Sequence, residues 1–159
     1  FKKIDAIKYF TKNTKKFDLI LIKQTIHLLK FVEIKRLLIL CKEKLKPKGK
    51  IIIFTLETNK NEIPSFLLMK KKLKKSLKRD QKIIRYIFKL NTKSLIRRFS
   101  FKVQILKKKY IKMIENRYIS ILLGFKFNEI SKGIEEINYK YKKILTFNDK
   151  LICLIINKP

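Results

Sequence analysis

A chain of 159 residues in which 46% are hydrophobic is long enough for about one folded domain, and this content excludes a disordered tail. Its 42 Lys and Arg against 12 Asp and Glu give a net charge of +30, which favours polyanionic partners such as nucleic acid or an anionic membrane surface. The excess of Lys together with Ile, Asn, Phe and Tyr is also what A/T-rich codons produce, so the charge by itself does not decide the partner.

The cysteines and the single histidine exclude several kinds of site. Cys41 and Cys153 lie far apart in apolar runs, as is typical of buried thiols in a reducing compartment, so we expect a cytoplasmic protein without a disulfide. His27 is the one histidine, which excludes a His-rich zinc site, and we expect no metal. No uncharged apolar run approaches the roughly 18–20 residues of a membrane span, so we expect none.

A strand, a helix and a second strand follow one another between residues 17 and 56. The run LILI, ending at Ile22, is apolar on successive residues, which is typical of a strand covered on both faces. Helical spacing of apolar residues from Glu33 to Leu45 predicts a helix, which Pro47 and Gly49 then end. The apolar run Ile51–Leu56 predicts the next strand, so this region forms a βαβ unit with a right-handed crossover.

Beyond Pro64 the pattern becomes helical. An apolar stripe from Phe66 to Ile87 predicts a long basic amphipathic helix, broken near Asp80. A cap at Asn91 or Thr92 then predicts a short helix carrying Leu95, Ile96 and Phe99.

The last third of the chain alternates strands and helices. The run FKVQI, residues 101–105, predicts a strand with one wetter face. Helices are expected at about 111–123 and 128–143, the second capped by Asn128. The run LICLII, residues 151–156, predicts a closing strand, and without an internal repeat or a linker we expect one compact α/β unit.

The order of these segments, with their motifs, resembles the second half of the class I S-adenosylmethionine-dependent methyltransferases. FDLILIKQTIHLL, the helix after it and LKPKGKIIIF are similar to the family's fourth strand, its helix and its fifth strand. Lys48 stands where the first glycine of the family's Leu-Lys-Pro-Gly-Gly turn usually stands. Ser100-Phe101 resembles the Gly-Phe that opens the sixth strand, and residues 147–158 resemble the antiparallel seventh strand.

This resemblance implies a fold and an extent. The fold is α/β, a Rossmann-like methyltransferase sheet that is partial, with strands in the family order 4-5-7-6 and helical insertions. Residues 1–159 are the carboxyl-terminal portion of one methyltransferase domain, with helical cover segments at about 60–95 and 110–145. The family's glycine-rich cofactor loop and its acidic second-strand residue are absent, so we expect a fragment, the alternative being a degenerate chain that no longer binds cofactor.

The resemblance also implies residues that contact the cofactor, S-adenosylmethionine. Asp5 and Ala6 match the pair that meets the adenine amino group, although an Asp before a helix is equally a cap. Lys23, Gln24 and Thr25 match the segment that lines the methionine end of the cofactor. Ligands of open α/β sheets bind outside the carboxyl ends of the strands, and these three residues directly follow such an end.

Four further residues are candidates for the acceptor side. His27 is the candidate catalytic base that takes a proton from a hydroxyl or amine nucleophile, and the alternative is a helix-start histidine that packs or bonds to backbone. Glu57 follows the fifth strand, and Arg117 and Tyr118 lie in the helical insertion, so these three are expected to bind the substrate. Arg117 has a structural alternative, a pair with a nearby glutamate.

Three functions follow for this chain. The first is a methyltransferase that acts on a small-molecule acceptor. The second is an RNA-directed methyltransferase, in which the Lys70–Lys82 segment tracks nucleic-acid phosphates. The third is a non-catalytic basic binding protein. The expected methyl transfer to a small molecule rests on the family resemblance, and nothing in the sequence names the acceptor atom.

Overall fold

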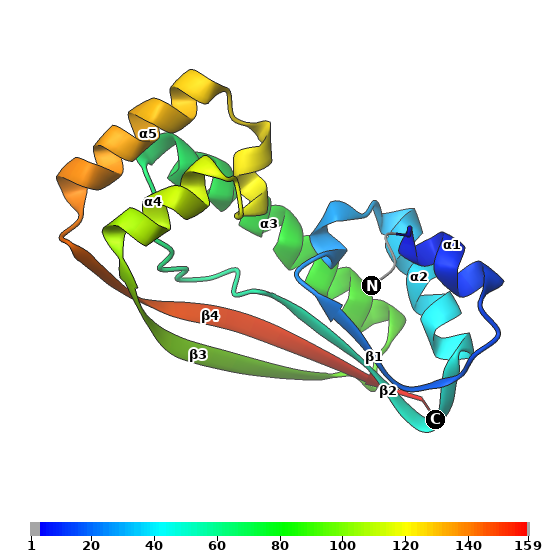
Figure 1. Ribbon diagram of the computed structural model, residues 1–159. Coiled ribbons are helices and arrows are strands. Elements are labelled where there is room, and N and C mark those ends of the chain that lie inside the picture. Colours follow the sequence, from blue (N-terminus) through cyan, green and yellow to red (C-terminus); the bar gives the residue numbers. More distant parts are fainter. Residues whose placement is uncertain (1–3, 159) are drawn as a thin grey trace. The chain divides into compact units, whose positions relative to one another are not determined.

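The computed structural model describes residues 4–158. Five α-helices, two short 3-10 helices and four strands follow one another in these residues (Figure 1). In chain order they are α1 Ala6–Lys12, β1 Phe17–Lys23, η1 Ile26–Leu28, α2 Phe31–Glu43, β2 Leu45–Leu56, α3 Leu67–Leu90, β3 Leu95–Leu106, α4 Lys107–Glu115, η2 Ser120–Gly124, α5 Phe127–Lys140 and β4 Ile144–Asn157.

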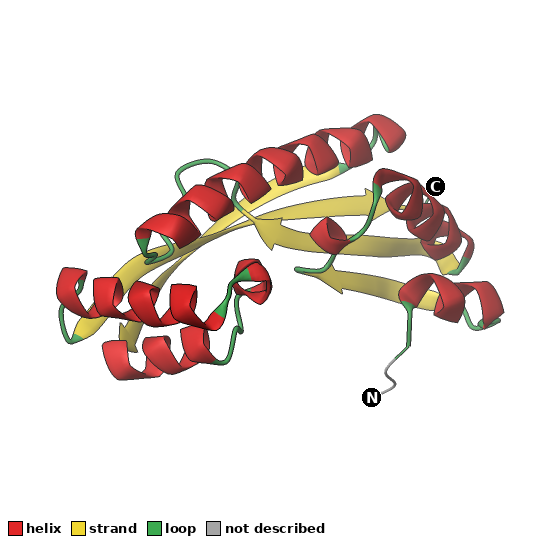
Figure 2. Ribbon diagram, turned by 90° about the horizontal axis from the view of Figure 1, so that it is seen from above, coloured by secondary structure: helices red, strands yellow, loops and turns green. Residues whose placement is uncertain are grey.

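The strands form one four-stranded sheet in the order β1-β2-β4-β3 (Figure 2). Strands β1 and β2 are parallel, with Ile20 opposite Ile51 and Ile22 opposite Ile53. The last strand, β4, enters beside β2 and runs antiparallel to it. This is the order 4-5-7-6 with an antiparallel seventh strand, so the predicted partial α/β sheet is confirmed.

The chain packs as two units rather than as the one compact unit that the sequence predicts. The first unit contains the described residues up to Glu57, Asp80–Phe99 and the residues from Leu151 on. The second contains Thr58–Arg79 and Ser100–Lys150. Each unit has its own cluster of buried apolar side chains, and α3, β3 and β4 each contribute residues to both units.

The core of the first unit lies on one face of the sheet. Alternate residues of β1, β2 and β4 form this core together with residues of α2 and of the carboxyl-terminal half of α3. The opposite face of β1 is open, since Leu19 and Leu21 are 52% and 55% exposed. The prediction that this strand is covered on both faces is therefore wrong for the described residues. Their helices pack on one face of β1 only, the face that carries Ile20 and Ile22.

The core of the second unit surrounds Phe66. Its ring is 1% exposed and packs edge-on against Phe125, with centroids 5.5 Å apart. Gly133 in α5 permits this arrangement, because a Cβ atom there would lie 2.6 Å from two atoms of the Phe66 ring. Tyr110 in α4 donates a hydrogen bond of 2.6 Å from its hydroxyl to the Pro64 carbonyl, and burial raises the pKa of this tyrosine. These contacts fix α4 and α5 around the start of α3.

Three local predictions need correction. Residues 95–99, expected in a short helix, belong to β3, which begins at Leu95, so Ser100 and Phe101 lie inside this strand and do not open it. Helix α3 continues through Asp80 without a break. Helix α5 begins at Phe127, and its cap is completed by Glu129, whose carboxylate accepts a 2.7 Å hydrogen bond from the Lys126 backbone N–H, so Asn128 lies inside the helix and is not its cap.

The turn before β2 is tighter than the sequence indicates. Helix α2 ends at Glu43 and β2 begins at Leu45, so the Lys-Pro-Lys-Gly segment already belongs to the strand. Lys48 has a φ of 62°, in the left-handed region that costs an L-residue about 1–2 kcal/mol. Glycine adopts this conformation freely, which gives a physical reason for the glycine that the resembling family has at this position.

Candidate functional site

The carboxyl ends of β1 and β2 meet at one edge of the sheet because these strands are parallel. Lys23 at the end of β1 is opposite Phe54 in β2. The pairing extends one residue further, since the Gln24 backbone N–H donates a 2.8 Å hydrogen bond to the Phe54 carbonyl. The predicted residues Lys23, Gln24 and Thr25 therefore follow directly from the last paired position of a parallel strand, at the edge where ligands of such sheets bind.

The backbone turns sharply out of the sheet at Gln24. Its φ of 50° lies in the left-handed region, where a non-glycine residue is strained. The turn leads into η1, whose Ile26 is 2% exposed and lies in the core of the first unit. Ile26 thereby anchors the segment, and His27, the next residue, is half-buried at the rim. Strained backbone at such an edge is common where a ligand is bound.

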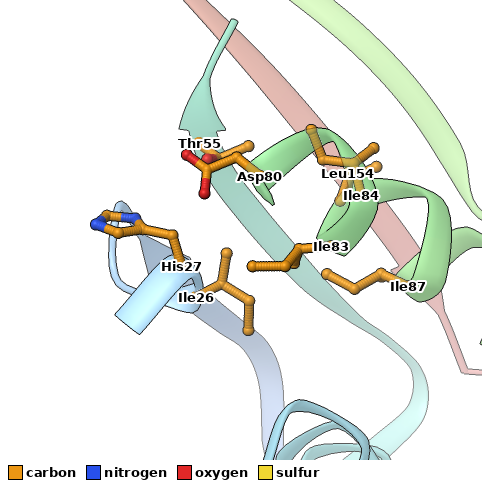
Figure 3. A pocket seen from close by; sticks show the side chains of 8 residues that line it. All are labelled: Ile26, His27, Thr55, Asp80, Ile83, Ile84, Ile87 and Leu154. Carbon is orange, nitrogen blue, oxygen red and sulfur yellow. The ribbon is translucent and has the colours of Figure 1, made fainter. Parts of the chain in front are cut away.

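His27 shares a small hollow with residues from β2, α3 and β4 (Figure 3). Most of the lining is apolar and belongs to the core. Its polar members are His27, Thr55 and Asp80, and the last two are 2% and 5% exposed. Figure 3 shows the Asp80 carboxylate extending from α3 toward the side of the hollow that holds His27 and Thr55. The remaining lining residues are Ile26, Ile83, Ile84, Ile87 and Leu154.

Asp80 is the residue that sequence reasoning missed. The sequence predicts a break in the helix near Asp80, but this residue occupies a position of the buried stripe of α3. The buried stripe runs, at spacings of three and four residues, through Met69, Leu73, Leu77, Asp80, Ile83 and Ile87. That spacing was visible in the sequence, and a carboxylate on an apolar stripe is the signal that could have found this residue.

Glu57, the expected substrate contact after β2, is 8% exposed and engaged by Arg98 of β3. The Arg98 Nε donates to the Glu57 carboxylate at 3.0 Å. The arginine side chain is largely exposed and the glutamate side chain is largely buried. A buried carboxylate needs such a partner, so this ion pair holds Glu57 in place at the carboxyl end of β2.

Asp5 caps α1, which begins at Ala6. Its carboxylate accepts a 2.8 Å hydrogen bond from the Lys8 backbone N–H, as an N-cap residue does. The alternative role of Asp5 as a helix cap is thus present, and its contact with the adenine of a cofactor stays a prediction.

Arg117 and Tyr118 belong to the second unit and follow α4. Arg117 has a φ of 54°, and its backbone N–H donates to the Ile114 carbonyl at 3.0 Å. Its side chain lines a hollow of about 250 Å³ together with residues of α5 and with Glu115. Tyr118 is 74% exposed. Since Asp5, Lys23 to His27 and Glu57 all lie in the first unit, a shared site with Arg117 and Tyr118 stays a prediction.

Residues 4–158 contain no group of three or more His, Cys, Asp or Glu side chains that could hold a metal ion. None of their helices is both long enough and apolar enough to cross a membrane.

No family model and no curated protein matches this sequence. Among solved structures, one similar chain is phosphoethanolamine N-methyltransferase 2 of Haemonchus contortus, in complex with phosphomonomethylethanolamine and S-adenosylhomocysteine. It is 17% identical with a TM-score of 0.43, over 98% of this chain and 36% of that one. A Bacillus halodurans C-125 protein described as a methyltransferase is 11% identical with a TM-score of 0.46, over 91% of this chain and 65% of that one.

A third similar structure is a plantazolicin methyltransferase in complex with a pentazolic desmethylPZN analogue and S-adenosylhomocysteine. It is 14% identical with a TM-score of 0.42, over 96% of this chain and 57% of that one. The chain therefore spans between 36% and 65% of the length of these three structures.

Proposed function

We propose that this chain is the carboxyl-terminal part of an S-adenosylmethionine-dependent methyltransferase that acts on a small-molecule acceptor. One observation carries the proposal. The last strand, β4, returns antiparallel beside β2, and the polar segment Lys23 to His27 follows the parallel edge strand β1. The family that the sequence resembles has both features together. A βα junction in an unrelated sheet would not require a last strand that runs antiparallel beside β2.

The residues present fit one side of the cofactor. Lys23, Gln24 and Thr25 at the strand end would hold its methionine part, and Asp5 would meet the adenine with the carboxylate oxygen that does not cap α1. The chain's packed glycines do not supply a cofactor loop. A Cβ atom on Gly49 would lie 2.9 Å from the Lys46 carbonyl oxygen, and Gly133 packs against Phe66. Cofactor contact from this chain is therefore limited to the rim.

The chemistry asks little of the protein beyond positioning. The cofactor supplies a methyl group that is already activated by a positive sulfur, so orientation and approach distance account for most of the acceleration. His27 is the residue at the rim that can take the proton of a hydroxyl or amine acceptor. Glu57, held by Arg98, would orient the acceptor.

The test uses the complete gene product that contains these residues. Binding of S-adenosylhomocysteine is measured by calorimetry, and transfer of a labelled methyl group is measured with a panel of small amines, hydroxyls, thiols and carboxylates. Asp5→Ala is expected to weaken binding, whereas the control Asp18→Ala, at an exposed carboxylate that pairs with Lys46 at 2.9 Å, is expected to leave it unchanged. His27→Ala is expected to lower transfer without weakening cofactor binding. Absence of binding by the wild-type protein would overturn the proposal.

A second candidate, an RNA acceptor, is supported by one face of α3. Lysines at spacings of one, three and four residues are exposed along the half of the helix in the second unit, namely Lys70, Lys71, Lys74, Lys75 and Lys78. Lys72 is not part of this strip, because its ammonium lies 3.7 Å from the Phe125 ring centroid and donates to the Gly124 carbonyl. Such a strip would follow a phosphate backbone without reading sequence.

The strip is tested by charge reversal. Changing Lys71, Lys74, Lys75 and Lys78 to Glu is expected to abolish salt-sensitive binding to bulk RNA. The control variant has the same change in charge at four exposed positions of the first unit. In it, Glu replaces Lys12, Lys15, Lys35 and Lys50. Equal losses in both variants would show that the net charge of the chain, and not the strip, attracts RNA.

A further inference from the structure

Asp80 occupies a position where a carboxylate is costly. It is 5% exposed on the buried stripe of α3, with Ile83, Ile84 and Ile87 beside it in the same hollow. An ionised carboxylate in such surroundings is unfavourable unless hydrogen bonds or an opposite charge compensate for the lost water. A leucine at this position would continue the stripe without that cost.

The surroundings of the hollow limit what can compensate. Of the side chains that line it, His27 and Thr55 are the ones with hydrogen-bond donors. The other buried carboxylate at this edge, Glu57, has Arg98 as its partner at 3.0 Å. Lys23 and Lys30, the charged residues nearest in sequence to His27, are exposed, and so are Arg79 and Lys82 beside Asp80 in α3. His27 is the lining side chain that can both donate to a carboxylate and carry a positive charge.

We propose that Asp80 is a positioning residue that accepts a hydrogen bond from one ring nitrogen of His27. The carboxylate would hold the imidazole in one tautomer and one orientation, with the other ring nitrogen as the proton acceptor at the rim. A proton from the nucleophile of an acceptor passes to that second nitrogen, while Asp80 stabilises the imidazolium that results. The catalytic meaning of the pair rests on the proposed function, but the pair itself does not.

The pair can be tested without an acceptor, because His27 is the chain's single histidine. Labelling with ¹⁵N-histidine gives ring signals from this residue alone, and a long-range ¹H–¹⁵N spectrum above neutral pH reports which nitrogen carries the proton. The wild-type chain is expected to show one dominant tautomer. In Asp80→Ala, the two nitrogen shifts are expected to move toward those of free histidine.

Two variants keep this test decisive. Asp80→Leu restores an apolar stripe and supplies a folded chain without the carboxylate if the alanine variant does not fold. Asp149→Asn is the control, since Asp149 is a partly buried carboxylate of the second unit, and burial raises its pKa. It is expected to leave the His27 spectrum as in the wild-type chain. A folded Asp80 variant whose His27 signals coincide with those of the wild-type chain would overturn the pair.

Activity of the complete gene product separates this inference from the proposed function. Asp80→Ala is expected to lower kcat by about a hundredfold to a thousandfold, within the range of general-base contributions, with the KM of the acceptor and cofactor binding little changed. If the His27 signals respond to Asp80→Ala but His27→Ala transfers methyl groups normally, the pair stands and the role of His27 as a base is wrong. If the signals do not respond, the pair is wrong whatever the activity.

Discussion

Gly133 and Phe66 offer a sharp test of how the second unit packs. A Cβ atom at Gly133 would lie 2.6 Å from Cδ1 and Cγ and 2.7 Å from Cε1 of the Phe66 ring, closer than real Cβ contacts. The ring is 1% exposed and packs against Phe125, so it cannot rotate into solvent. Alanine gains about 1 kcal/mol of helix propensity over glycine, whereas overpacking a core costs typically 1–3 kcal/mol. Gly133→Ala is therefore expected to lower the free energy of unfolding by up to about 2 kcal/mol.

A double-mutant cycle isolates the clash from the change in helix propensity. Phe66→Leu removes the ring atoms that the new methyl group would meet, so Gly133→Ala is expected to be neutral or stabilising in that background. Urea unfolding of the four proteins measures the coupling, which is expected to be about 1–2 kcal/mol. Gly124→Ala is a control, because no atom lies within 4 Å of the Cβ position there. A Gly133→Ala variant as stable as the wild-type chain, with no coupling to Phe66, would refute the packing argument.

Three further predictions concern separate features. Lys48→Gly relieves a φ of 62° and is expected to raise the free energy of unfolding by roughly 0.5–1 kcal/mol. Lys50→Gly in β2 is the control and is expected to lower that free energy by a similar amount. Equal effects of the two substitutions in urea unfolding would contradict the argument that Lys48 is strained. The hydrogen bond from Lys150 lowers the pKa of Glu62, so ionised Glu62 stabilises the fold fully above the usual carboxyl pKa, and this contribution is lost as pH falls through the lowered pKa. Glu62→Gln is therefore expected to reduce the loss of unfolding free energy that is measured between about pH 6 and about pH 3. Burial raises the pKa of the Cys41 thiol to about 12 and also raises that of Cys153, so both should react with a thiol reagent far more slowly in the native than in the unfolded chain.

Local patterns in the sequence were sufficient for the part of the fold that holds the site. The unbroken apolar runs near Ile20 and Ile51, with a helical stripe and a Pro-Gly turn between them, predicted the parallel pair that is observed. Such signals are reliable because strand and helix periods, and the conformational limits of Pro and Gly, act within a few residues. The position of His27 after a parallel strand could be predicted for the same reason.

Other features depended on residues that are distant in the sequence. Leu95, Ile96 and Phe99 fit a helical stripe as well as a strand, and pairing within the sheet decided for β3. The run at Leu19 and Leu21 looks buried on both faces, but burial requires a covering element, and the described residues place one on a single face.

At the site itself, Asp80 illustrates the difference between what local sequence patterns determine and what contacts between distant segments determine. Its place on a helical stripe was fixed by spacing that the sequence displays, whereas its neighbours His27 and Thr55 come from segments that precede it by more than twenty residues. The amino-acid sequence alone determined which side chains end the strands and which faces of the helices are apolar. Only the tertiary structure decided which of those side chains share a hollow, because burial and pairing are set by contacts between segments that local patterns do not specify.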